Sequence, residues 1–189
     1  MRKLKVSVRG KVLVFSDIHL PYSKPDALKR IVFAESPDLL VLLGDIVVDP
    51  RFDYKSIFTV PTVFVRGDED VVDGDTDVLE LVYPNFNVVL LHGHQFFKES
   101  SQKFLAELLK KVHPSIPPFL FCSFFRLLFP THYFLILGHS HALIKFNSIR
   151  CVNAGTLTTL KNLYNDHGYV VIEPNRKVEI VRLKNWESV

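Results

Sequence analysis

Five short apolar runs, each leading into a polar stretch that contains Asp or His, constrain the fold of this chain more than any other feature. The runs are Val12–Phe15, Leu39–Leu43, Val63–Val65, Val88–Leu91 and Phe134–Leu137. The polar stretches that follow them are Ser16–His19, Gly44–Asp45, Gly67–Asp70, His92–His94 and Gly138–His141. A short apolar run bounded by turn residues predicts a buried strand. Because ligands of open α/β sheets collect beyond the carboxyl ends of strands, we expect these Asp and His side chains to share one edge of an α/β fold.

The residue types in these stretches favour a metal site. Asp17 and His19 are separated by one residue, as are His139 and His141. If the extended backbone continues past the end of each strand, both members of a pair point to the same face and can share one ion. Carboxylate and imidazole groups together suit divalent transition metals. The alternative for Asp17 is a helix N-cap, and for a His after a strand it is a polar loop residue.

The length and composition of the chain limit what such a site can belong to. At 189 residues the chain is predicted to form a single domain, residues 1–189. A formal charge of +3 is too small to indicate nucleic-acid binding. No uninterrupted apolar segment follows the charged start of the chain, so we expect no signal peptide. Cys122 and Cys151 stand in apolar surroundings without metal-type spacing, which predicts reduced, buried thiols and a cytoplasmic location.

The remaining periodicities predict an alternation of strands and helices. A helix over Lys24–Glu35 between two buried strands predicts a parallel strand pair with a right-handed crossover. Alternation over Lys3–Val8, followed by Arg9-Gly10, predicts a hairpin with the next strand. Further expectations are a helix over Asp77–Val82, an amphipathic helix over Gln102–Val112 and an antiparallel meander after Leu143.

The most apolar stretch of the chain, Ile116–Phe129, lies in a predicted helical insert at about residues 98–132. Proline and Arg126 interrupt it, and it is too short to span a membrane. Three interpretations compete: a helix packed on the core, a dimer surface, and a lid over the site. We favour a surface for a partner, which can be a second copy of the chain, because an apolar helix without a polar face must be covered.

The ordered motifs resemble those of the calcineurin-like metallophosphoesterases. That family's series is Asp-x-His, Gly-Asp, Gly-Asn-x-Asp, His-Gly-His and Gly-His-x-His, and the polar stretches here follow the same order from Val12 onward. Asn153–Thr156 is similar to the Asn-Pro-Gly-Ser stretch of the small single-domain phosphodiesterase branch. The resemblance implies a four-layer α/β/β/α sandwich of two mostly mixed sheets with flanking helices.

The resemblance also implies a site with two divalent ions. By position, one metal would be bound by Asp17, His19 and His141, and the other by Asp68, His92 and His139. Asp45 would bridge the two metals. The implied reaction is hydrolysis of a phosphate ester, with phosphodiesters expected, by in-line attack of a metal-bridging hydroxide. Mn is the expected ion, and Fe, Ni, Co or Zn would also suit these ligands.

Two positions depart from the family pattern. Asp68 stands where the family has Asn, and the extra negative charge predicts tighter metal binding but weaker attraction of phosphate. Glu69 stands where many members place the His that protonates the leaving group. Glu69 and His94 are therefore candidate catalytic residues beside Asp45, with a solvated loop residue as the alternative for Glu69.

Two other functions are compatible with the same fold. The retromer scaffold subunit resembles this fold yet acts mainly in protein interaction, so a metal-binding interaction scaffold with little catalysis is the alternative function. Every metal-ligand position is filled here, which favours the enzyme. A nuclease of the DNA-repair branch is less favoured, because the chain has no capping domain and no concentrated basic stretch.

Overall fold

Two β-sheets form the centre of the computed structural model, which describes residues 1–96, 99–160, 163–184 and 186. The five-stranded sheet has the order β11 (Val178–Arg182), β10 (Gly168–Ile172), β2 (Val12–Phe15), β3 (Leu39–Leu43) and β4 (Thr62–Val65). The six-stranded sheet has the order β1 (Lys3–Ser7), β5 (Val78–Val82), β6 (Asn87–Leu91), β7 (Phe134–Leu137), β9 (Cys151–Ala154) and β8 (Leu143–Phe146). Both sheets mix parallel and antiparallel pairs.

The predicted strand–helix–strand unit is confirmed. Every residue of β2 and β3 is buried, which explains their continuous apolar sequence, and the two strands pair in parallel. Between them runs α1 (Pro25–Glu35), with proline in its first turn and Ser36 in the left-handed conformation at its end.

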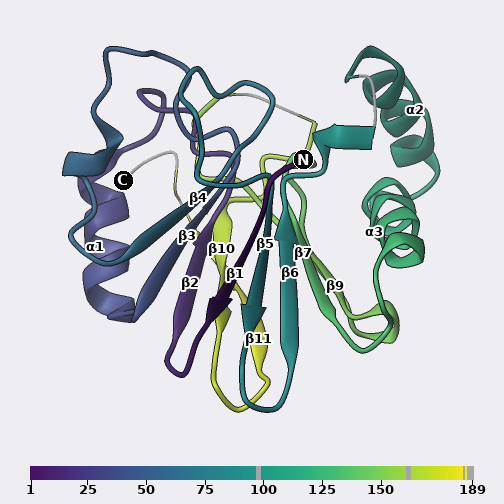
Figure 1. Cartoon of the computed structure of the whole chain (residues 1–189). Coiled ribbons are helices and arrows are strands. Elements are labelled where there is room, and N and C mark those ends of the chain that lie inside the picture. The colour runs from purple at the N-terminus through teal and green to yellow at the C-terminus, as the bar shows by residue number, and fades with distance from the viewer. Residues whose placement is uncertain (97–98, 161–162, 185, 187–189) are drawn as a thin grey trace.

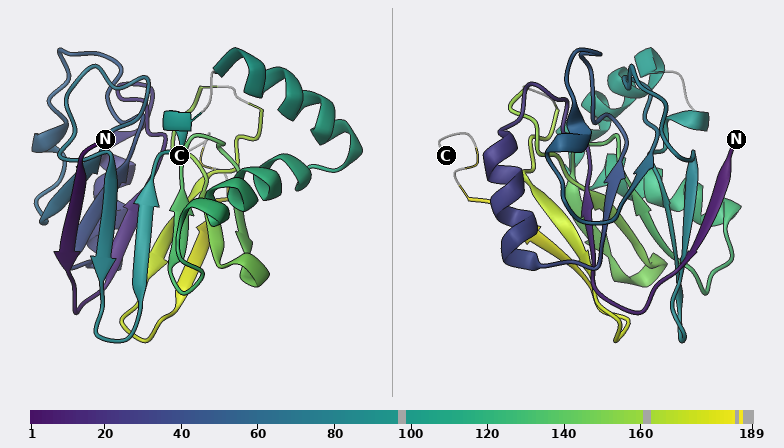
Figure 2. Two further views of the ribbon diagram at one scale, coloured as in Figure 1. Left: turned by 45° about the vertical axis from the view of Figure 1, so that its right-hand side comes forward. Right: turned by 60° about the vertical axis from the view of Figure 1, so that its left-hand side comes forward.

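The apolar side chains divide into three clusters that define four layers (Figures 1 and 2). The first cluster lies between the sheets and contains Val14 and Val41 from one sheet and Leu90 and Ile136 from the other. The second joins α1 to the outer face of the five-stranded sheet. The third joins α3 (Ile116–Leu128) to the outer face of the six-stranded sheet. The expected α/β/β/α sandwich is therefore present.

Two helices occupy the segment between β6 and β7. The helix expected over Gln102–Val112 lies within α2 (Glu99–Val112), which packs on α3. On α3, Pro118, Cys122 and Phe125 are buried, whereas the Leu127 side chain is 85% exposed. No helix in the described part of the chain is long and apolar enough to cross a bilayer. That α3 packs on the core is confirmed, and its role as a partner surface stays a prediction.

The predicted hairpin of the first two strands is wrong. β1 pairs in parallel with β5 in the six-stranded sheet, while β2 lies in the other sheet between β3 and β10. Both edges of β2 are thus occupied, and β1, whose residues are exposed or half-buried in alternation, becomes an edge strand.

Two further predictions of local structure are wrong. The segment expected as a helix over Asp77–Val82 is the strand β5, which pairs with β1 and β6, so cross-strand packing of its Val and Leu residues overrides the capping signal. The expected meander is divided between the sheets: β8 and β9 pair in one, and β10 and β11 pair in the other.

The two cysteines are buried as expected, but the prediction of reduced thiols is wrong. Cys122 of α3 and Cys151 of β9 form a disulfide, with their Cα atoms 6.0 Å apart. The two residues are 29 positions apart in the sequence and meet because α3 packs across β9. The thiol argument for a cytoplasmic location therefore fails, and the location itself stays a prediction.

Candidate metal centre

The loops that follow five strands bring the seven predicted metal ligands to one edge of the two sheets. Asp17 and His19 follow β2, Asp45 follows β3, Asp68 follows β4, His92 follows β6, and His139 and His141 follow β7. Their ligand atoms form two groups, each within 4.8 Å: Asp17, His19 and His141 in one, and Asp45, Asp68, His92 and His139 in the other. A third, overlapping group of the same spread contains His19, Asp45 and Glu69.

The backbone at this edge differs from the extended geometry that the spacing suggested. Five of the seven residues have a left-handed backbone: Asp17 (φ 50°), His19 (52°), Asp45 (52°), His139 (64°) and His141 (54°). Asp and His tolerate this region better than most residues, yet each such residue costs about 1–2 kcal/mol. Strained backbone of this kind concentrates at functional sites. The paired side chains therefore meet through tight turns and not through a continued strand.

Two glycines let the loops approach each other. Gly44 has a φ of +75°, and a Cβ atom there would collide with the His92 ring. A Cβ atom on Gly67 would collide with the carboxylate and backbone nitrogen of Asp45. The Gly-Asp sequence after β3 and β4 therefore has a packing reason, because only glycine leaves room for the neighbouring site residue.

Asp17 is the centre of the first group. Its Oδ1 atom lies 3.2 Å from Nε2 of His141, and its Oδ2 accepts a hydrogen bond from the backbone N–H of His139 at 3.1 Å. Complete burial raises the pKa of Asp17, but the charges of the neighbouring histidines, His141 foremost, outweigh burial and leave the pKa well below its ordinary value. The Thr156 hydroxyl donates to the Asp17 carbonyl at 2.7 Å and ties the loop after β9 to this group.

His92 is the centre of the second group. Its Nε2 atom lies 3.1 Å from Oδ2 of Asp45 and 3.1 Å from Oδ1 of Asp68. Its Nδ1 atom lies 3.0 Å from the carbonyl oxygen of Leu43, which can only accept, so Nδ1 carries the proton and Nε2 faces the carboxylates. His139 adds its Nδ1 at 3.2 Å from Oδ1 of Asp68.

The charges of the second group shift the pKa values of its members. Burial lowers the pKa of His92, but the charges of Asp45 and Asp17 outweigh it and hold that pKa well above 6.5. For Asp68, burial raises the pKa, and the neighbouring His139 and His92 imidazoles more than reverse this, so the pKa is strongly lowered. Both shifts have the direction expected when attraction between a carboxylate and an imidazolium outweighs the effect of burial.

Several buried polar atoms at this edge fit a divalent metal. Within the described part of the chain, Oδ1 of Asp17, Nε2 of His19 and Nε2 of His92 make no aligned hydrogen bond, although two of them have ion-pair neighbours at 3.1–3.2 Å. A buried polar atom left without a hydrogen bond is costly. Carboxylate oxygens and imidazole nitrogens are ligands of divalent transition metals. The residues present therefore fit divalent-metal binding.

Asp70 was missed by sequence reasoning as a member of the site, although it ends the polar stretch after β4. Its Oδ1 atom accepts the backbone N–H groups of Ile46 (2.6 Å) and Val47 (2.9 Å). Its Oδ2 accepts those of Asp45 (2.9 Å) and Gly67 (2.7 Å). One buried carboxylate thus joins the loop after β3 to the loop after β4. Its position two residues after Asp68 was the available signal.

The two candidate catalytic residues other than Asp45, Glu69 and His94, lie at the rim of the site. The Glu69 side chain is 51% exposed, and its Oε2 atom lies 3.2 Å from Nδ1 of His19, while its backbone N–H donates to Oδ1 of Asp45 at 2.9 Å. Nδ1 of His94 lies 3.8 Å from Oδ1 of Asp68, and burial, followed by the charge of His92, lowers the pKa of His94.

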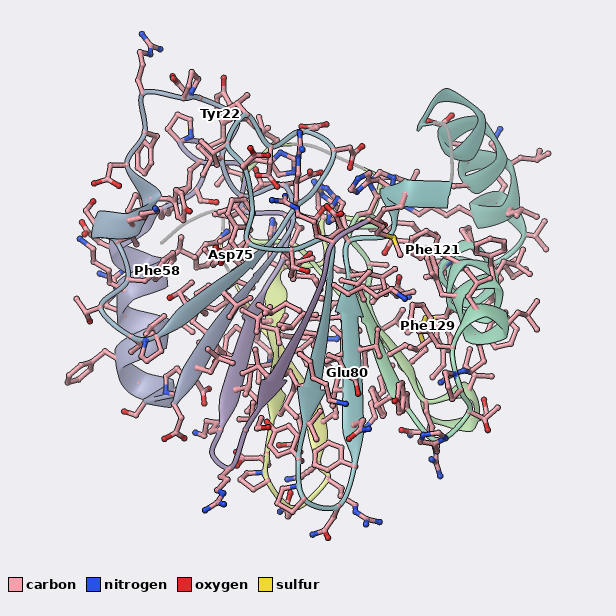
Figure 3. The ribbon with its side chains drawn as sticks, viewed as in Figure 1. Tyr22, Phe58, Asp75, Glu80, Phe121 and Phe129 are labelled. Carbon is pink, nitrogen blue, oxygen red and sulfur yellow. A yellow bond between two sulfur atoms is a disulfide. The ribbon has the colours of Figure 1, made fainter. Side chains whose placement is uncertain are left out.

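Helix α3 reaches the same rim. The Phe121 ring, labelled in Figure 3, has its centroid 6.4 Å from that of the His139 ring, at an interplanar angle of 28°. A Cβ atom on Gly93, between His92 and His94, would meet the Phe121 ring. The apolar helix therefore contributes a wall beside the second group.

Residues 11–177 match the calcineurin-like phosphoesterase superfamily domain. The chain is 27% identical over 168 residues to a Mycoplasma genitalium protein named as a probable metallophosphoesterase, with 88% of each chain covered.

Solved structures with low sequence identity share the fold. Zn-bound Vps29 from Entamoeba histolytica has a TM-score of 0.56 at 18% identity, covering 92% of this chain and 98% of that one. The E. coli phosphoesterase Yfce has a TM-score of 0.53 at 18% identity, covering 92% and 100%. A structure described as a novel archaeal phosphodiesterase has a TM-score of 0.55 at 15% identity, covering 92% and 99%.

Proposed function

The chain belongs to the calcineurin-like phosphoesterase superfamily, and from this premise we propose that it is a phosphodiesterase that uses two divalent metal ions. The observation that supports two ions most directly is the position of Asp45. Its carboxylate belongs to one group with Asp68, His92 and His139 and to another with His19 and Glu69. A carboxylate shared in this way suits a bridge between two ions.

The proposed ligand sets follow the two groups of side chains. Asp17, His19 and His141 would hold one ion. Asp68, His92 and His139 would hold the other, with Asp45 between them. When bound, two such ions supply a nucleophile at neutral pH by lowering the pKa of water, and they neutralise charge on the phosphoryl oxygens.

The side chains around the ligands have roles of their own in this proposal. The Leu43 carbonyl keeps the proton of His92 on Nδ1, so that Nε2 stays available. The lowered pKa of His94 leaves its imidazole neutral at neutral pH, able to donate one N–H to a phosphoryl oxygen. Glu69, at the exposed rim beside His19, is the candidate that protonates the leaving oxygen.

A metal add-back assay tests the proposal. Metal-stripped protein would be given Mn, Fe, Ni, Co, Zn or Mg singly and assayed with bis-p-nitrophenyl phosphate and with p-nitrophenyl phosphate. We expect diester cleavage that is strongest with Mn and lost in Asp45→Asn, with Asp26→Asn, an exposed carboxylate outside the site, as the matched control. Absence of turnover with every ion, despite metal binding, would contradict the proposal.

The exposed apolar surface of α3 favours a second candidate function, a metal-binding interaction scaffold. Phe119, Leu120, Leu127 and Leu128 are exposed on this helix. Four large apolar side chains on the side of α3 that faces away from the sheet form a surface suited to a protein partner, which can be a second copy of the chain. Sedimentation of the wild type and of Leu127→Glu would test self-association: we expect a dimer that the charge disrupts, and a monomeric wild type would contradict it.

A further inference from the structure

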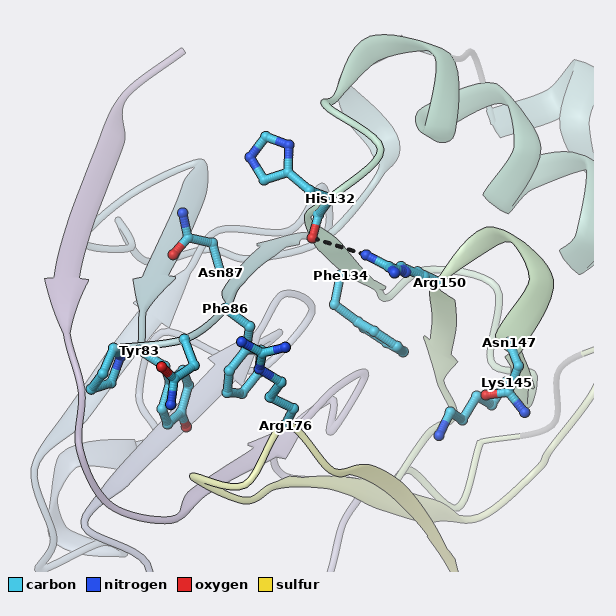
Figure 4. A pocket seen from close by; sticks show the side chains of 11 residues that line it. Tyr83, Phe86, Asn87, His132, Phe134, Lys145, Asn147, Arg150 and Arg176 are labelled. Carbon is cyan, nitrogen blue, oxygen red and sulfur yellow. Dashed lines mark hydrogen bonds between the residues drawn. The ribbon is translucent and has the colours of Figure 1, made fainter.

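A cavity of about 780 Å³ lies at the edge of the sheets opposite the candidate metal centre. Its walls come from the β5–β6 turn, the start of β7, the end of β8 with the turn that follows, and the β10–β11 turn (Figure 4). Asn87, at the start of β6, lines it, whereas His92 follows the other end of that strand. Five residues of strand separate the two positions by roughly 16 Å, so the cavity is distinct from the metal centre.

Three cationic side chains line this cavity. They belong to Lys145, Arg150 and Arg176, and none of the described residues that line it carries a carboxylate. Within the described part of the chain, none of these three cations forms a salt bridge: Lys145 donates to the Val178 carbonyl at 2.7 Å, and Arg150 donates to the His132 carbonyl at 3.4 Å. Arg126 adds a further cation beside the lining, because it donates to the Tyr133 carbonyl at 2.8 Å, and Tyr133 lies between the lining residues His132 and Phe134.

Acidic side chains act on the cavity from outside its lining. The charges of Glu173 and Asp38 act on Tyr83, whose pKa is raised first by burial and then by these two carboxylates. Neither carboxylate lines the cavity. Cations that form no salt bridge attract an anion to a concave surface, and a guanidinium group matches the geometry of a phosphate.

The same cavity offers aromatic surface. Phe86 stacks on Tyr83 with ring centroids 4.4 Å apart and an interplanar angle of 14°, which holds the Phe86 ring in place. Phe134, on strand β7, also lines the cavity, and Nζ of Lys145 lies 5.9 Å from the centroid of the Phe134 ring. Aromatic side chains of this kind provide surfaces on which nucleic-acid bases stack. The volume is also in the range of small-molecule sites, larger than a lone phosphate needs.

We propose that this cavity binds a nucleotide, with its phosphates on Arg150 and Arg176 and its base against Phe86 and Phe134. Asparagine side chains at the rim, including those of Asn87 and Asn147, offer donors and acceptors to the base and sugar. The proposal requires no metal and is independent of the phosphodiesterase activity proposed above.

Calorimetric titration of the full-length, chelator-treated protein tests the proposal. The probes are AMP, ATP, adenosine and inorganic phosphate. We expect AMP and ATP to bind at micromolar concentrations, and the double variant Arg150→Gln/Arg176→Gln to weaken binding at least tenfold. Lys177→Gln is the matched control, because Lys177 stands in the same turn as Arg176 but does not line the cavity. Binding should be unchanged in that control and in Asp45→Asn.

Each contrary result overturns the proposal in a distinct way. Failure of AMP and ATP to bind, or equal binding by the double variant, removes the cavity as a phosphate site. Loss of binding in Asp45→Asn would place the nucleotide at the metal centre instead. Inorganic phosphate binding as tightly as AMP, or AMP binding unaffected by Phe134→Leu, would refute the contact with the base.

Discussion

Replacing Asp70 by alanine would remove the single acceptor of four backbone N–H groups, those of Asp45, Ile46, Val47 and Gly67. A buried donor left without a partner costs about 1–3 kcal/mol. Water can enter the space that the carboxylate leaves, so the low end applies to each donor and the sum is about 4 kcal/mol. That sum is a large fraction of the roughly 5–15 kcal/mol by which a typical domain is stable.

The asparagine variant separates the acceptor role from side-chain volume. Each oxygen of Asp70 accepts two N–H groups, so Asp70→Asn keeps one oxygen and two of the four bonds. Its expected cost is about half that of alanine, roughly 2 kcal/mol. Asp75→Asn is the control, because among the described residues Asp75 accepts one backbone N–H, that of Phe64 at 2.8 Å, and an amide oxygen can replace that contact.

Urea unfolding of the chelator-treated proteins measures these differences as shifts in the unfolding free energy. The expected order of destabilisation is Asp70→Ala, then Asp70→Asn, then Asp75→Asn with little change. If Asp70→Asn costs no more than Asp75→Asn, or if alanine costs no more than asparagine, the acceptor role assigned to Asp70 is wrong.

Three further predictions concern the site and the core. Asp68→Asn removes a negative charge beside His92 and His139. We expect titrations to show at least tenfold weaker metal binding and assays to show a higher rate of diester cleavage. Unchanged metal affinity and an unchanged rate would contradict this prediction. The raised pKa of His92 stabilises the metal-free fold at pH values below the ordinary pKa of about 6.5, and this stabilisation is lost as the pH rises through the raised pKa. Metal affinity should increase over the same pH interval, because the imidazole loses the proton that competes with the metal. Urea unfolding and metal titration, each at pH 6 and at pH 9, check the two directions. Phe125 is fully buried between α3 and the six-stranded sheet, so Phe125→Ala should destabilise the fold by about 3–5 kcal/mol in the same unfolding assay, and a loss below about 1 kcal/mol would refute that packing.

Local sequence patterns predicted several elements of the framework and the residues that gather at one edge, whereas the four-layer arrangement was expected from the family resemblance. The continuous apolar runs of β2 and β3 predicted buried strands, and the helical periodicity between them predicted α1. The order of the polar stretches predicted that Asp17, Asp45 and His92 share one edge, because strands carry their carboxyl-terminal loops to a common side.

Long-range contacts decided the rest. β5 became a strand because β1 and β6 were available to pair with it, although its own residues also carried a helix-capping signal. Cys122 and Cys151 met because α3 packs across β9. The Asp70 carboxylate accepts four backbone N–H groups that belong to two different loops. Asp17 and His19 adopt the left-handed backbone conformation. Sequence by itself determined which segments become apolar strands and which side chains follow them, since both depend on near neighbours; only the tertiary structure decided their partners, because pairing and burial depend on residues distant along the chain.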